Sequence, residues 1–97
     1  MRIAKADIPK SEGRSFRGDN GKEIVVYHRE DGVFEVLSGM CTHEQCDVDW
    51  NGYAKTWDCP CHGARYDPHG AVINGPAVEN LHPLRYTDLG EELEVEG

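Results

Sequence analysis

Cys41-Thr42-His43-Glu44-Gln45-Cys46 and Cys59-Pro60-Cys61-His62 are the two short stretches that decide how this chain is organised. Together they contain all four cysteines of the 97-residue sequence. A C-x-H followed by a C-x-x-H offers two thiolates and two imidazoles, which suit either a tetrahedral zinc ion or an iron–sulfur cluster of mixed ligation. The sequence therefore predicts a metal centre between residues 41 and 62.

Zinc and an iron–sulfur cluster differ in how they use the cysteines. If each stretch gives one Cys–His ligand pair, Cys46 and Cys61 are left over. A zinc site made of all four thiols leaves the histidines unexplained, and it uses Cys59 and Cys61 across a single residue, which is closer than the usual C-x₂₋₄-C spacing. The sequence favours a cluster, with a structural zinc module or a redox-sensing domain as the alternative.

The region from Met40 to Ala77 resembles the Rieske family. The matching residues are Cys41-Thr42-His43, Cys46, Cys59-Pro60-Cys61-His62-Gly63, Tyr66-Asp67, Gly70 and Gly75-Pro76-Ala77. The resemblance implies a [2Fe–2S] cluster with two thiolates on one iron and two imidazoles on the other. Carried over to this sequence, the ligands of the inner iron would be Cys41 and Cys59, and those of the outer, solvent-facing iron would be His43 and His62.

The resemblance also implies the surroundings of the cluster. Cys46 and Cys61 match the disulfide that joins the two loops in the high-potential branch of the family, and Pro76 matches the proline loop that covers the cluster. Neutral imidazoles leave less negative charge on the cluster than thiolates do, so an added electron meets less repulsion. Rieske centres accordingly work at about −150 to +300 mV, against about −400 mV for plant-type ferredoxins.

Two residues depart from the pattern of the disulfide-bearing members. Gln45 stands where these members usually have Gly, a residue that tolerates positive φ. Ala64 stands where they have a Ser whose hydroxyl donates to a bridging sulfide, whereas Tyr66 matches a Tyr that donates to a ligand sulfur. We therefore expect a potential below that of the quinol-oxidising members and above that of ferredoxins that lack both the disulfide and the hydroxyls.

The rest of the chain reads as short strands and turns. Residues 23–28 and 33–37 flank a turn at 30–32, and residues 84–87 and 93–95 form a last hairpin that we expect to return to the N-terminal strands. Residues 55–58 lead into the second stretch, and 64–66 with 71–73 form a hairpin after it. We expect Trp50, Trp57 and Tyr86 to lie in the core and shield the cluster.

These patterns predict one all-β domain, residues 1–97, with the Rieske-like fold that the resemblance implies. Both ends of the chain would form an antiparallel sandwich base, and a cluster-binding subdomain of about residues 40–75 would be inserted in it.

Charge and hydropathy exclude several classes of function. The formal net charge is −8, from 18 acidic and 10 basic residues. This balance argues against nucleic-acid binding and suits basic patches on redox protein partners. No apolar run approaches the roughly 20 residues of a membrane span, and no secretory signal is visible, so the sequence predicts a cytoplasmic protein.

The leading hypothesis for function is a one-electron carrier, a soluble Rieske ferredoxin between a reductase and a terminal oxidoreductase such as an oxygenase. No motif for substrate chemistry is visible, so we expect an electron-transfer protein rather than an enzyme. The alternative is a subunit or detached domain of a larger oxidoreductase, quinol-oxidising or flavoprotein-linked. Glu44 speaks against the quinol version, since that branch usually has an apolar residue after the first histidine.

Overall fold

The computed structural model of the chain describes residues 1–42 and 46–96, and the regular secondary structure of these residues consists almost entirely of short antiparallel strands. The elements are β1 Arg2–Ala4, the 3₁₀ helix η1 Lys5–Asp7, β2 Gly13–Arg17, β3 Glu23–His28, β4 Phe34–Ser38, β5 Asp49–Asn51, β6 Thr56–Asp58, β7 Arg65–Tyr66, β8 Val72–Asn74, β9 Tyr86–Asp88 and β10 Glu92–Val95. The predicted all-β class is confirmed. In the described part of the chain, no helix has the length and apolar character needed to cross a bilayer.

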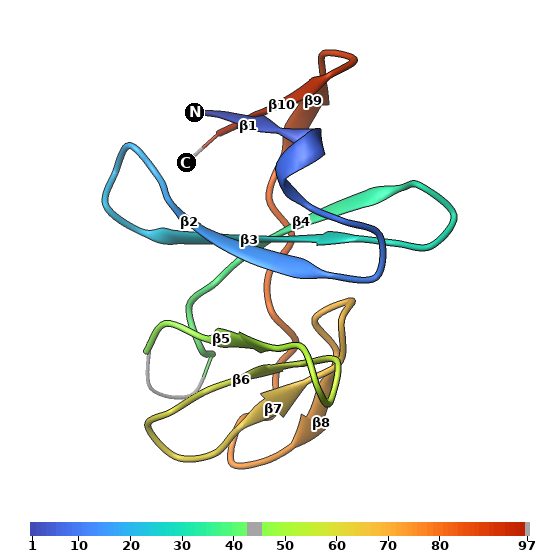
Figure 1. The fold of residues 1–97 in the computed structure, drawn as a ribbon. Helices are drawn as coiled ribbons and strands as arrows, with labels where there is room; N and C mark the ends of the chain where they lie inside the picture. The colour runs from blue at the N-terminus through green and yellow to red at the C-terminus, as the bar shows by residue number, and fades with distance from the viewer. Residues whose placement is uncertain (43–45, 97) are drawn as a thin grey trace.

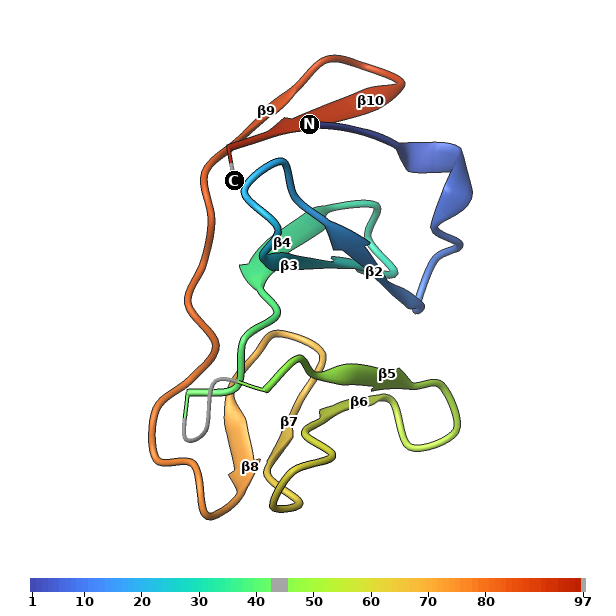
Figure 2. The ribbon, with the colours of Figure 1, turned by 90° about the vertical axis from the view of Figure 1, so that its left-hand side faces the viewer.

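The strands are arranged in three layers (Figure 1). The sheet β2-β3-β4 lies between the sheet β1-β10-β9, which contains both ends of the chain, and the sheet β5-β6-β7-β8. The first two sheets form the predicted antiparallel base, and the third carries the two cysteine-containing loops. Figure 2 shows the same order of layers from the side.

Strand β3 is buried on both faces because it belongs to this middle layer. Successive side chains of a strand point to opposite faces. Val25 and Tyr27 pack in one core together with Trp57 of β6, whereas Ile24 and Val26 pack in a second core together with residues of β1 and β10. The continuous apolar run in β3 therefore contributes side chains to both cores.

The two ends of the chain pair with each other. In the β1–β10 ladder Ile3 lies opposite Leu93, and β10 pairs on its other side with β9. This is the predicted return of the last hairpin to the N-terminus. Tyr86 on β9 is 39% exposed and its hydroxyl donates to the Phe34 carbonyl at 3.1 Å, so the expectation that Tyr86 is a core residue was wrong. The reason is that β9 is an edge strand.

The third sheet is anchored to the base through its tryptophans. The rings of Trp50 and Trp57 lie 4.8 Å apart, and Trp57 is fully buried, as the sequence predicts. At Gly13 of β2 a Cβ atom would lie 2.7 Å from the Trp57 ring, so the base and the third sheet approach each other too closely for a larger residue. This packing fixes β6, the strand that leads directly into Cys59.

Glu23, the first residue of β3, is a buried carboxylate at the base of the first loop. It is 7% exposed, and within the described ranges its Oε2 has no hydrogen-bond partner. Its neighbour across the ladder, Arg17, donates instead to Asp47 at 2.9 Å. Burial, followed by the charge of Asp47, raises the pKa of Glu23 to about 7.

We expect Glu23→Gln to stabilise the protein increasingly as the pH rises from about 4.5 to about 7. Because the pKa of Glu23 is raised on folding, its contribution to stability is complete below the ordinary value of 4.5 and is lost as the pH rises through about 7. The loss amounts to at most about 3 kcal/mol. Denaturant unfolding at pH 5 and pH 8 measures it, with the exposed Glu91→Gln as the control. An equal effect of Glu23→Gln at both pH values would contradict this account.

Candidate metal centre

The first loop connects β4 to β5, and backbone hydrogen bonds join the two ends of the loop. The Cys41 N–H donates to the Cys46 carbonyl at 2.7 Å, and the Val48 N–H donates to the Gly39 carbonyl at 2.9 Å. These bonds hold Cys41 at the bottom of the loop, where it is 1% exposed. His43, Glu44 and Gln45, on which three of the sequence predictions fall, lie outside the described residues.

The second loop is a tight turn between β6 and β7. The Cys59 N–H donates to the Ala64 carbonyl at 2.8 Å, and the Gly63 N–H donates to the Cys59 carbonyl at 3.1 Å. Gly63 has a φ of 78°, a conformation that glycine adopts without strain. The turn buries Cys59 and leaves His62 exposed, so one loop presents a sulfur inward and an imidazole at the surface.

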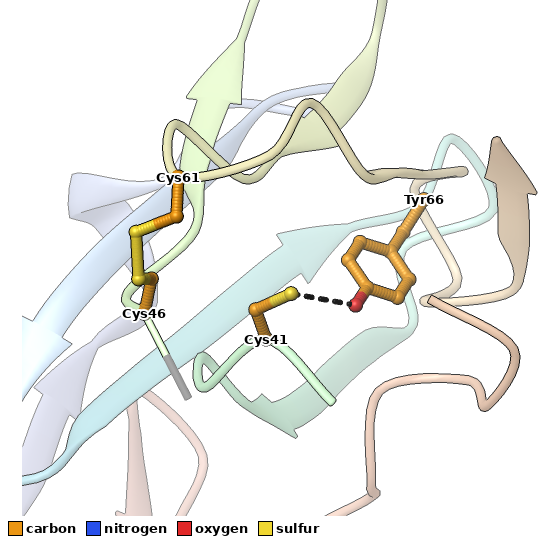
Figure 3. Close-up of a disulfide and its surroundings, with 4 residues drawn as sticks. All are labelled: Cys41, Cys46, Cys61 and Tyr66. Atoms are coloured by element: carbon orange, nitrogen blue, oxygen red, sulfur yellow. Dashed lines mark hydrogen bonds between the residues drawn. A yellow bond between two sulfur atoms is a disulfide. The ribbon is translucent and has the colours of Figure 1, made fainter. Parts of the chain in front are cut away.

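A disulfide between Cys46 and Cys61 joins the two loops (Figure 3), which confirms the pairing predicted from the resemblance. The two Cα atoms lie 6.5 Å apart across a sequence separation of 15 residues. The sulfur of Cys59 lies within 4.8 Å of both disulfide sulfurs. Since those two sulfurs are bonded to each other, the thiols that remain for a metal are Cys41 and Cys59.

The two thiols come from opposite loops and share one buried site. Burial, followed by the hydrogen bond with Cys41, raises the pKa of the Cys59 thiol. A bound metal ion reverses this effect, because coordination deprotonates a thiol. The two buried sulfurs fit the sulfur side of a mixed-ligand cluster. The exposed imidazole of His62, on the same loop as Cys59, fits one ligand of the histidine side.

Tyr66 of β7 points its hydroxyl into this site from the opposite side (Figure 3). The hydroxyl lies 3.3 Å from Cys41 Sγ, and the phenol is fully buried. Burial, followed by the contact with Cys41, raises the pKa of Tyr66, so the phenol keeps its proton. The structure therefore places Tyr66 next to one of the two thiols.

Residues 75–80, which we call the strap, follow β8 and contact the first loop at Thr42. Pro76 is exposed, whereas Ala77 is buried in the same core as Cys41 and Cys59. The Thr42 hydroxyl donates to the Glu79 carbonyl at 2.8 Å, and the Asn80 side chain accepts from the Val72 N–H at 3.0 Å. The strap is thus held against both the first loop and β8.

The role of Thr42 was missed in the sequence. Thr42 lies inside the first cysteine stretch, but its hydroxyl contacts Tyr66 and Glu79, which are 24 and 37 residues away. No local pattern links these positions. The only sequence signal was the location of Thr42 between two predicted ligands.

Ala64 lies in the core that contains Cys41, Cys59 and Tyr66, and it is 1% exposed. We expect Ala64→Ser to raise the reduction potential, because a hydroxyl there adds a hydrogen-bond donor beside the negatively charged cluster. A donor to a charged acceptor is worth about 1.5–3 kcal/mol, which corresponds to about 65–130 mV for one electron. Protein-film voltammetry of Ala64→Ser measures the shift, with Ala64→Gly as the control without a hydroxyl. An unchanged potential in Ala64→Ser would remove this explanation.

Residues 3–86 match the family model of the Rieske [2Fe-2S] domain. The chain is 41% identical over 83 residues to the putative Rieske 2Fe-2S iron-sulfur protein YhfW of Bacillus subtilis (strain 168), a match that covers 86% of this chain and 16% of that protein. It is 39% identical over 71 residues to the cytochrome b6-f complex iron-sulfur subunit of Chlorobaculum tepidum, covering 73% of this chain and 38% of the subunit. The chain thus spans less than half the length of either relative.

Solved structures show the same fold. The plasma membrane Rieske protein PetC3 of Synechocystis PCC 6803 superposes with a TM-score of 0.80 at 24% identity, covering 100% of this chain and 99% of that one. The ferredoxin of carbazole 1,9a-dioxygenase from Nocardioides aromaticivorans IC177 superposes with a TM-score of 0.68 at 22% identity, covering 96% and 91%. At these identities the likeness concerns the fold alone.

Proposed function

The chain belongs to the Rieske [2Fe–2S] family and is an iron–sulfur electron carrier, and from this premise we propose that its cluster is bound by Cys41 and Cys59 on one iron and by His43 and His62 on the other. The observation that supports this assignment is the pair of buried thiols in two loops that a disulfide holds together. His62 lies on the second loop and is exposed, as a ligand of the solvent-facing iron should be.

The residues around the site have separate roles in electron transfer. When bound, the cluster accepts and releases one electron at a time. Cys41 and Cys59 are shielded from water in the core, and the Tyr66 hydroxyl, 3.3 Å from Cys41 Sγ, would donate to that sulfur once it is a deprotonated ligand. The exposed His62 offers the electron a short path to the surface, and Ala77 of the strap packs in the same buried core as the two thiols.

We further propose that the electron passes between two protein partners, a reductase and a terminal oxidoreductase such as an oxygenase. The net charge of −8 favours steered association with basic surfaces, and the charged Glu44 beside His43 suits a protein partner better than a quinol pocket. The rate of reduction by a basic reductase should fall at least about tenfold between low and physiological salt. Stopped-flow measurements at several salt concentrations give this rate of reduction. A rate that does not change with salt would refute electrostatic steering.

Analysis of the purified protein tests the cluster itself. We expect two irons and two acid-labile sulfides per chain, visible absorption that bleaches on reduction, and an electron paramagnetic resonance signal only in the reduced protein. A colourless protein that contains zinc would overturn the proposed function.

A second candidate is the iron–sulfur subunit or domain of a larger oxidoreductase. It is favoured by the 39% identity to a cytochrome b6-f complex subunit and by the small share of each relative that this chain spans. Reduction by a quinol as fast as by a protein reductase would favour this candidate over the ferredoxin. Reduction by the reductase alone would favour the ferredoxin.

A further inference from the structure

Thr42 and Tyr66 form a hydrogen-bond network that links Cys41 to the strap. The Tyr66 hydroxyl lies 3.3 Å from Cys41 Sγ and 3.1 Å from Thr42 Oγ1. The Thr42 backbone N–H donates to the same phenol oxygen at 3.2 Å. The Thr42 hydroxyl in turn donates to the Glu79 carbonyl at 2.8 Å.

This network contains fewer hydrogens than it has acceptors. A carbonyl oxygen only accepts, so the single hydrogen of the Thr42 hydroxyl is committed to Glu79. In its contact with Tyr66, the Thr42 oxygen must therefore accept. The single hydrogen of the Tyr66 hydroxyl then has two acceptors within reach, Cys41 Sγ and Thr42 Oγ1.

We infer that Thr42 is a positioning residue that divides the hydrogen of the Tyr66 hydroxyl between its own oxygen and Cys41 Sγ. Thr42 thereby keeps the reduction potential of the cluster below the value that an undivided Tyr66–Cys41 hydrogen bond would give. A hydrogen bond to a ligand sulfur stabilises the reduced cluster more than the oxidised cluster, since the reduced cluster carries more negative charge. Any share of the hydrogen that Thr42 takes lowers the potential. The inference rests on the proposed ligation by Cys41.

The surroundings of the Thr42 hydroxyl leave room for water to take its place. Thr42 and Glu79 both line an open hollow of about 140 Å³, so a water molecule there can donate to the Glu79 carbonyl in place of the lost hydroxyl. The Thr42 backbone N–H still donates to Tyr66 after the substitution. The hollow is lined by Ser38, Met40, Cys41, Thr42, Glu79 and His82.

The test is the reduction potential of the cluster-loaded protein in a set of variants. Thr42→Val keeps the side-chain shape and removes the oxygen, so we expect the potential to rise. Thr42→Ser keeps the oxygen and should leave the potential near that of the parent. Tyr66→Phe removes the shared hydrogen and should lower the potential. Once Tyr66→Phe is present, Thr42→Val should produce no further rise, because no hydrogen is left to redistribute.

Each outcome decides the inference. A rise in Thr42→Val that disappears in the Tyr66→Phe background supports it. A rise of the same size in both backgrounds would show an effect of packing or solvent access and would overturn it, as would an unchanged or lower potential in Thr42→Val. If Thr42→Val does not load the cluster, Thr42→Ala removes the same oxygen and is compared with Thr42→Ser. If the parent protein contains no [2Fe–2S] cluster, the proposed function itself fails, which is a different result.

Discussion

Replacing Cys59 with serine is expected to abolish cluster binding. A serine hydroxyl remains protonated at neutral pH and is a poor ligand for iron compared with a thiolate, and Cys59 is one of the two thiols that the disulfide leaves for a metal. The buried position gives a replacement ligand little access, because Cys59 is 2% exposed. Iron and sulfide analysis and the visible spectrum of the purified variant measure the loss, which we expect to be essentially complete.

The chain offers matched controls for the ligand assignment. His62→Ala should also lose the cluster, whereas His69→Ala and His82→Ala should keep it. The ring of His69 contacts Glu35 and that of His82 contacts Glu79, and neither imidazole belongs to the proposed ligand set. Full iron content and an unchanged spectrum in Cys59→Ser would show that the proposed ligand set is wrong.

The second large effect is expected from the disulfide. Replacing both Cys46 and Cys61 with alanine should lower the free energy of unfolding by about 3 kcal/mol, because the bond closes a loop of 15 residues in the unfolded chain. For a domain of this size that loss corresponds to a decrease of roughly 12–24 °C in the melting temperature. A domain of 97 residues has a small core, so one cross-link accounts for a large share of its stability. Thermal unfolding at a fixed scan rate, without reductant, measures the difference.

Reduction of the parent protein provides the control for the disulfide. After complete reduction the parent should melt close to the double variant, and alkylation followed by mass spectrometry should label Cys46 and Cys61 only after reductant is added. Equal melting temperatures of the oxidised parent and the double variant would show that the cross-link contributes little to stability. The double variant should still bind iron, since it keeps Cys41, Cys59 and both proposed histidine ligands.

The local chemistry of the sequence was enough to predict the metal centre and most of the strands. The Cys–His stretches contain the thiol and imidazole donors themselves, and the softness of these donors determines which metals they favour. Turn residues such as those at 30–32 and 88–90 mark hairpins because they set backbone angles locally. The pairing of Cys46 with Cys61 came from the resemblance to a family, and the structure contains it.

The tertiary structure alone decided how the environment acts on these residues. Glu23 looks like an ordinary strand residue in the sequence, and only the layers packed on β3 remove its carboxylate from water and raise its pKa to about 7. Tyr86 looks like a core residue, but β9 is an edge strand and leaves it exposed. The contacts of Thr42 with Tyr66 and Glu79 join segments that are far apart along the chain. Donor identity and turn preference belong to single residues and their neighbours, whereas burial and the sharing of one hydrogen depend on which distant segments the fold brings together.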